Sequence, residues 1–87
     1  MKAFPLKISS PEGDVFAGEV VSVSVRGAEG ELAVMAGHIP FVSPIKPCDC
    51  RIMLEDETLK TGHLDGGILT VSSDKTVILT GSFAWKE

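Results

Sequence analysis

Two closely spaced cysteines are the first candidates for chemistry in this chain. Cys48 and Cys50 are separated only by Asp49. In a β-strand, residues i and i+2 point to the same face with Cα atoms about 6.5 to 7 Å apart, at or beyond the limit of unstrained disulfide geometry. A zinc site would need two further ligands, and the usual Cys-x2-Cys spacing is missing. We therefore expect two reduced, partly buried thiols on one strand face, and no metal and no cofactor.

The two histidines are the next candidates. His38 lies between Gly37 and Pro40, in or beside a turn, whereas His63 lies within an alternating segment. A catalytic histidine needs a nucleophile, a base partner or a metal beside it, and no such motif accompanies either residue. A ring that bonds to backbone or contacts a partner fits His38 better, and a surface position fits His63. We predict no catalytic residues and no enzyme activity for this chain by itself.

Glycine-rich and acidic segments are the remaining candidates for a phosphate, cation or partner site. Residues 27–30 and 66–67 hold paired glycines but lack the helix and the Lys-Ser/Thr pair of a phosphate-binding loop. Such glycines more often mark tight bends or the close approach of two strands. The acidic run 55–57 is typical of a solvated hairpin tip. The segment 29–31 places two carboxylates on either side of a glycine in a loop. From the residues alone, this can be an ordinary acidic loop or a contact loop.

Composition narrows the class of protein. The 87 residues suffice for one domain, residues 1–87, and the net charge of −4 with scattered basic residues argues against nucleic-acid binding. The apolar fraction of 44% and charged fraction of 23% are ordinary for a soluble globular protein. We find no apolar run long enough for a transmembrane segment and no signal or transit peptide at the N-terminus. We expect a soluble, non-secreted protein.

The elements that must position these residues have a period of two. Val21, Val23 and Val25 alternate with polar residues, and residues 4–9 show the same pattern. Residues 64–71 and 77–80 supply two further strand-like runs. Turn signals separate the runs at about 8- to 12-residue spacing, and no window has helical spacing. The prediction is an all-β protein, a two-sheet β-sandwich of about eight to ten short strands.

The order of motifs along the chain resembles a known family. Glu-Gly-Glu at 29–31 is followed by Gly-His-x-Pro at 37–40, and Gly-Gly-Ile-Leu-x-Val stands at 66–71. Together they resemble the N-terminal β-sandwich domain of the epsilon subunit of F-type ATP synthases, called delta in mitochondria. The resemblance covers essentially the whole chain. Residues 33–38 depart from the family's usual Gly-Ile-Leu-Pro-Gly-His, and the family's C-terminal helical pair is missing. A sandwich without those helices is expected neither to bind ATP nor to restrain hydrolysis.

The resemblance implies a non-catalytic part of the rotor in the central stalk. Such a subunit links gamma to the membrane c ring and helps to couple ion translocation to ATP synthesis or hydrolysis. It implies a peripheral place on the cytoplasmic face of the bacterial cell membrane, and we expect a monomer when the chain is isolated. Carried over by position, the c-ring contacts are Ala28, Glu29, Gly30 and Glu31, and the gamma contacts are Ser10, His38, Ile39, Pro40, Val42 and Ser43. Phe41 is expected in the core.

One alternative remains open at the level of sequence, a stand-alone ligand-binding β-sandwich such as a carbohydrate module. It would need a platform of exposed aromatic rings. The chain has four phenylalanines, one tryptophan and no tyrosine. Three of the phenylalanines occupy expected core positions, which leaves little for a platform.

Overall fold

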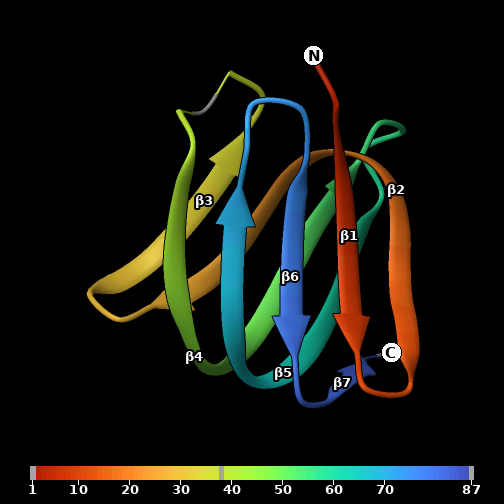
Figure 1. Ribbon diagram of the computed structural model, residues 1–87. Coiled ribbons are helices and arrows are strands. Elements are labelled where there is room, and N and C mark those ends of the chain that lie inside the picture. Colours follow the sequence, from red (N-terminus) through yellow and green to blue (C-terminus); the bar gives the residue numbers. More distant parts are fainter. Residues whose placement is uncertain (1, 38, 87) are drawn as a thin grey trace.

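The structure, a computed structural model, describes residues 2–37 and 39–86. His38, one of the predicted gamma contacts, lies outside the described residues. The described part holds seven β-strands and no helix (Figure 1). The strands are β1 (Phe4–Ser10), β2 (Gly13–Gly27), β3 (Gly30–Met35), β4 (Phe41–Leu54), β5 (Leu59–Val71), β6 (Thr76–Thr80) and β7 (Phe83–Trp85). Accordingly, no helix in this part is long and apolar enough to cross a membrane.

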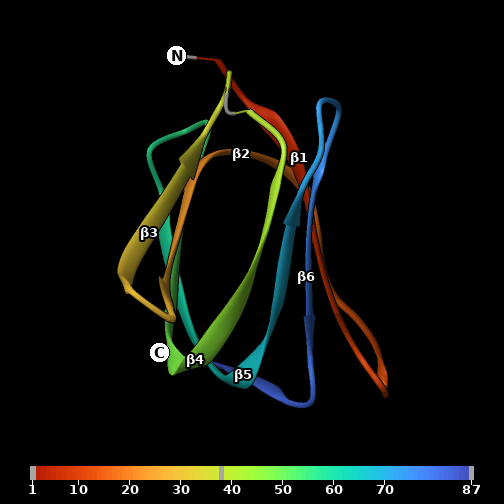
Figure 2. The same cartoon turned by 60° about the vertical axis from the view of Figure 1, so that its left-hand side comes forward.

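The strands form two packed layers, which Figure 2 shows nearly edge-on. The front layer consists of β1, β6, residues 67–71 of β5 and residues 41–45 of β4, with the first half of β2 paired to β1. The back layer consists of β3, the second halves of β2 and β4, the first half of β5, and β7. Since β1 pairs with both β2 and β6, the strands β1, β6, β5, β4 and β2 close into a circuit.

The predicted all-β, two-sheet class is confirmed, but the described residues form seven strands rather than eight to ten. The difference arises because β2, β4 and β5 are 15, 14 and 13 residues long and run through both layers. The β4–β5 pair bends as a unit near Gly66 and Gly67, whose φ angles of 82° and 154° favour glycine. A Cβ on Gly67 would overlap the carbonyl oxygen of Leu79 on β6. The glycine pair thus permits the bend that carries two strands from one layer to the other.

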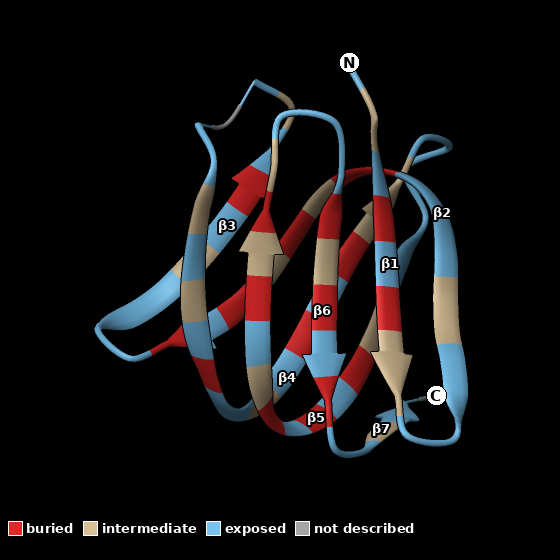
Figure 3. Cartoon of the chain, in the orientation of Figure 1, coloured by how far each residue is buried: buried red, intermediate tan, exposed pale blue. Residues whose placement is uncertain are grey.

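The core lies between the layers and follows the predicted alternation. Val23 and Val25 are buried, whereas the residues between and beside them are more exposed (Figure 3). Burying a large aliphatic side chain contributes about 1.5 to 3 kcal/mol, so this alternation fixes which face of each strand turns inward. The largest side chains with almost no exposure are Leu6, Ile8, Ile52, Leu64, Leu69 and Ile78.

Candidate functional site

The β2–β3 turn is the first predicted contact site. Its residues Ala28, Glu29, Gly30 and Glu31 are all exposed, and the turn projects from one end of the back layer (Figure 1). Gly30 has a φ of 131°, a conformation that side-chain-bearing residues rarely adopt. At the base of the turn, a Cβ on Gly27 would lie 2.8 Å from Cδ1 of Leu32. The glycines therefore set a tight turn whose two strands approach closely.

The two carboxylates of this turn have different surroundings. Oε1 of Glu31 lies 3.0 Å from Nη2 of Arg51 on β4, and Arg26 is the residue paired with Glu31 across the β2–β3 ladder. Among the described residues, Glu29 has no ion pair or side-chain hydrogen bond. The charge of Glu31 is thus compensated within the chain, while that of Glu29 is open to solvent.

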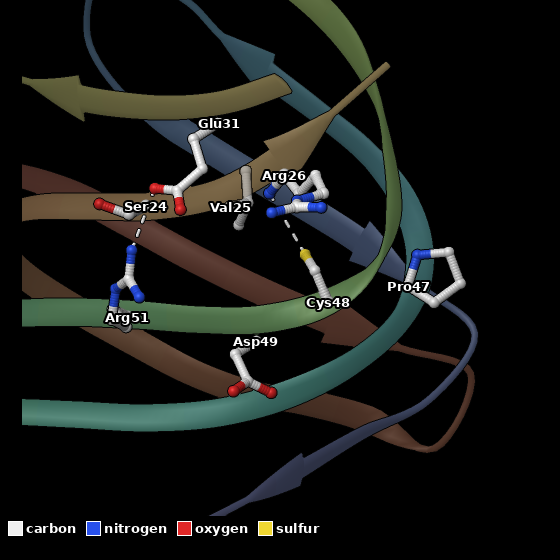
Figure 4. A pocket seen from close by; sticks show the side chains of 8 residues that line it. All are labelled: Ser24, Val25, Arg26, Glu31, Pro47, Cys48, Asp49 and Arg51. Atoms are coloured by element: carbon white, nitrogen blue, oxygen red, sulfur yellow. Dashed lines mark hydrogen bonds and ion pairs between the residues drawn. The ribbon is translucent and has the colours of Figure 1, made fainter. Parts of the chain in front are cut away.

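A hollow of about 290 Å³ lies beside this ion pair, where the β2–β4 ladder is interrupted between Ser24 and Gly27. Figure 4 shows Glu31 and Arg51 reaching toward each other across β2, with Cys48 pointing toward the backbone of Arg26. The lining mixes both charges with a thiol, and comprises Ser24, Val25, Arg26, Glu31, Pro47, Cys48, Asp49 and Arg51. Within the described residues, no cluster of three His, Cys, Asp or Glu residues could hold a metal ion.

The two thiols of this region are both free, as predicted. Cys48 is half-buried, and its Sγ accepts a hydrogen bond from the N–H of Arg26 at 3.3 Å. Cys50 is buried, and its burial, with a smaller effect of the neighbouring Cys48, raises the pKa of its thiol to about 12. The two cysteines therefore differ in access, and burial makes the reactive thiolate of Cys50 hard to form.

This difference predicts the thiol reactivity of the folded protein. Near pH 8 we expect one fast equivalent with 5,5′-dithiobis(2-nitrobenzoate), from Cys48, because the thiolate is the nucleophile and Cys50 stays protonated and inaccessible. The second equivalent, from Cys50, should react only as fast as the protein unfolds locally around this thiol. In denaturant, both thiols should react with the reagent at once. The variant Cys48→Ser should lose the fast phase. Two fast equivalents from the native protein would contradict this assignment.

The predicted gamma contacts do not form one patch. Ile39 and Val42 are 78% and 67% exposed, and Pro40 is exposed between them. Ser43 projects from the opposite face of β4 because side chains alternate along a strand, and its hydroxyl bonds to the carbonyl of Pro44 at 3.0 Å.

Ser10 is separated from this group. It ends β1, and β6 and β5 lie between β1 and β4 in the front layer. Its hydroxyl donates to the carbonyl of Gly13 at 3.2 Å and accepts from the N–H of Glu12 at 3.3 Å. The described interactions of Ser10 thus belong to the β1–β2 turn.

The outer face of the front layer carries an apolar surface that includes the predicted contact residue Val42, but whose members Ile68 and Leu79 were not predicted. In the register of the front layer, Ile68 of β5 lies between Pro44 of β4 and Leu79 of β6. Val42 is two residues before Pro44 on β4 and therefore lies on the same face. Ile68 and Leu79 are 48% and 52% exposed. We call Val42, Pro44, Ile68 and Leu79 the front apolar face. Its sequence signal was the unbroken apolar runs at 68–69 and 77–79, which place apolar side chains on both faces of a strand.

His63 and Trp85 of the back layer each contact a charged side chain of the same layer. His63 is exposed, as predicted, and its Nδ1 lies 3.1 Å from Oδ1 of Asp49. The hydrogen bond from Lys86, and secondly that from His63, lowers the pKa of the Asp49 carboxyl. The Nζ of Lys60 lies 4.6 Å from the ring centroid of Trp85, so this cation already occupies one face of the tryptophan.

The fold and these surfaces define a class, a β-sandwich domain that presents an exposed apolar sheet face and an acidic turn. The family model described as "ATP synthase, Delta/Epsilon chain, beta-sandwich domain" matches residues 3–86. The chain therefore belongs to the delta/epsilon family of ATP synthase chains and represents its β-sandwich domain.

Three relatives show the extent of the similarity. The ATP synthase epsilon chain, sodium ion specific, of Acetobacterium woodii is 38% identical over 86 residues, which cover 99% of this chain and 65% of that relative. One solved structure is the OSCP/F1/c-ring part of the mitochondrial ATP synthase of Euglena gracilis. A chain of that structure superposes on this one with a TM-score of 0.90 at 21% sequence identity, over 95% of this chain and 53% of that chain. A chain from the structure of the central stalk and c ring of the Tetrahymena thermophila mitochondrial ATP synthase also matches. Its TM-score is 0.77 at 11% sequence identity, over 94% of this chain and 66% of that chain. The two structural matches establish the shared fold.

Proposed function

We propose that this domain is a non-catalytic rotor component in the central stalk of an F-type ATP synthase, linking gamma to the membrane c ring. The observation that carries the proposal is the front apolar face, a set of exposed aliphatic side chains on three neighbouring strands. Contiguous exposed apolar patches of this kind commonly mark protein–protein contact sites. Family membership supports this function, and so do the two structural relatives, one from the OSCP/F1/c-ring part and the other from the central stalk and c ring of a mitochondrial ATP synthase.

The front apolar face is the proposed gamma contact. A stable interface buries about 800 Å² per partner, which is a large share of a chain whose whole exposed surface is 5215 Å². Ile39 and Pro40 extend the same contact beyond the start of β4. Ser43 is left out of this set because it projects from the other face of the strand.

The β2–β3 turn is the proposed c-ring contact. It lies at the end of the back layer, away from the acidic β4–β5 turn at the opposite end of the molecule (Figure 1). An exposed carboxylate there suits donors on the polar loops of a ring, and charge-assisted hydrogen bonds would set the register. Through these two contacts the domain is held peripherally at the cytoplasmic face of the membrane and helps to couple ion translocation to ATP synthesis or hydrolysis.

The gamma contact is tested by placing charge in the front apolar face. The double variant Ile68→Glu/Leu79→Glu is expected to weaken binding to purified gamma by about 100-fold or more, because two carboxylates would be desolvated without partners. Binding is measured by isothermal titration calorimetry, and folding by circular dichroism.

The matched control is Leu59→Glu, because Leu59 is equally exposed, at 54%, but belongs to the back layer. It should leave the affinity for gamma unchanged. An unaltered affinity in the double variant, or an equal loss in the control, would argue against this face as the contact.

A further inference from the structure

We infer that β7 and the following Lys86 form a latch, which closes one side of the sandwich and opens separately from the rest of the domain. Three side chains of the latch, those of Phe83, Trp85 and Lys86, contact three different parts of the chain. β7 lies at the end of the molecule where the β1–β2 turn also lies (Figure 1). The inference goes beyond the proposed function and depends on neither of the proposed partner contacts.

Backbone pairing leaves this side of the sandwich open. In the described part of the chain, residues 13–19 of β2 pair only with β1, and β7 pairs only with β5. The first half of β2 is therefore one edge of the front layer, and β7 is one edge of the back layer. Since no ladder joins these two edges, any link between them is made by side chains.

Aromatic rings make that link. The ring of Trp85 meets the ring of Phe16 on β2 edge to face, with the centroids 6.1 Å apart and the planes at 68°. Trp85 makes a second contact of this kind with Phe83, at 4.8 Å and 74°. The Nζ of Lys60 on β5 lies 4.6 Å from the centroid of the Trp85 ring. Both kinds of contact are favourable at these distances, so Trp85 connects the edge of the front layer with β5.

The back layer has a place for the other ring of the latch. Gly62 of β5 is buried, and a Cβ at this position would overlap the ring of Phe83. The ring thus fills the space that a side chain on residue 62 would need. Beyond β7, the N–H of Lys86 donates to the carbonyl of Thr61 at 2.8 Å, and its Nζ lies 2.9 Å from Oδ2 of Asp49 on β4.

These contacts hold a segment that buries little. Among the described strands, β7 is the shortest and the only one without a buried residue. Its contacts with Lys60 and Asp49 involve exposed side chains, and exposed ion pairs contribute little to stability. Segments with few buried apolar groups open locally at the lowest free energy. Because β5 stays paired with β4 on its other side, β7 can leave β5 while the core remains folded.

Native-state hydrogen exchange, measured by NMR in urea below the unfolding transition, tests whether the latch opens alone. The amides of Asp65 and Lys86 donate to the carbonyls of Ser82 and Thr61 across the β5–β7 pair. After correction for intrinsic rates, they should exchange at least about tenfold faster than the slowest amides of residues 68–71, which are paired on both sides. Their exchange should also depend little on urea, because opening the latch exposes little surface. Urea dependence equal to that of residues 68–71 would overturn the inference.

Gly62→Ala is expected to displace the ring of Phe83 and so to open the latch. The exchange of the Lys86 amide should become about tenfold faster or more. Acrylamide quenching of Trp85, the only tryptophan, should rise about twofold, because its ring loses the cover of Phe16 and Phe83. The matched control is Gly81→Ala, which adds a Cβ with no atom within 4 Å and should change neither measurement.

A second variant separates opening of the latch from loss of the fold. Phe83→Ala truncates the ring instead of crowding it, and it should raise the quenching of Trp85 with an unchanged far-UV circular dichroism spectrum. Adding Gly62→Ala to Phe83→Ala should then increase quenching no further, because the displaced ring is already absent. Unchanged quenching in Phe83→Ala, or a further twofold increase in the double variant, would contradict the latch.

Discussion

Replacing Gly67 by alanine is expected to lower the free energy of unfolding by about 3 to 5 kcal/mol. Two effects act together at this position. Its φ of 154° disfavours a side chain, and a Cβ would overlap the backbone carbonyl of Leu79. The clash is with backbone rather than with a flexible side chain, and Gly67 pairs with both Ile45 and Thr80. Relief would therefore require β5 to move away from its partners. Urea denaturation followed by circular dichroism measures the loss.

The matched control is Gly81→Ala. No atom lies within 4 Å of a Cβ placed on Gly81, and its φ is not positive. The same substitution there should change the free energy of unfolding by less than about 0.5 kcal/mol. Similar losses at both glycines would mean that the close approach of β5 to β6 is not what excludes a side chain.

Leu69→Ala is expected to cost about 2 to 5 kcal/mol, because the truncation leaves a cavity in a packed core. Leu69 has no exposed surface and lies between the layers. Its neighbour Ile68 is 48% exposed on the other face of the same strand. Ile68→Ala should therefore change stability in the isolated chain by only about 0.5 kcal/mol. Denaturation of the two variants in parallel tests the assignment of faces, and a larger loss at Ile68 would reverse it.

Much of the fold was predictable because short-range alternation reports burial directly. The pattern of Val21, Val23 and Val25 predicts one buried face of a strand, and all three are buried. A register shift between Val20 and Ser22 nevertheless leaves Val20, not Val21, in the core with Val23 and Val25. The acidic run 55–57 and the segment 72–75 mark the turns that the structure has between β4 and β5 and between β5 and β6. These signals depend only on neighbours in sequence, so one chain suffices to read them.

The length of the strands was harder to predict. Pro44 and Pro47 interrupt the usual strand pattern, yet both lie inside β4. Proline is tolerated in a strand where one edge needs no hydrogen-bonded partner, and β4 is paired mainly with β5 over this stretch. A bend near Gly66 also allows one long strand to belong to both layers. From the sequence alone, the glycines at the bend suggest two short strands instead of one long one.

The contact surfaces required the tertiary arrangement. The front apolar face joins Val42, Ile68 and Leu79 from three strands, and only the register shows that they are neighbours. Likewise, Glu31 and Arg51 are far apart in sequence, and their ion pair appears only once β3 lies beside β2. Motifs identified the acidic turn but did not distinguish its two carboxylates.

The closed circuit of strands also has a consequence for how the chain matures during synthesis. β1 is translated first, yet it pairs in parallel with β6, near the other end of the chain. The β1–β2 hairpin can form early, but the circuit closes only when residues 76–80 are available. Pairings between such distant segments make folding slow relative to chains dominated by local contacts. The nascent domain must therefore keep one side of β1 unpaired until translation has almost reached the end of the sandwich.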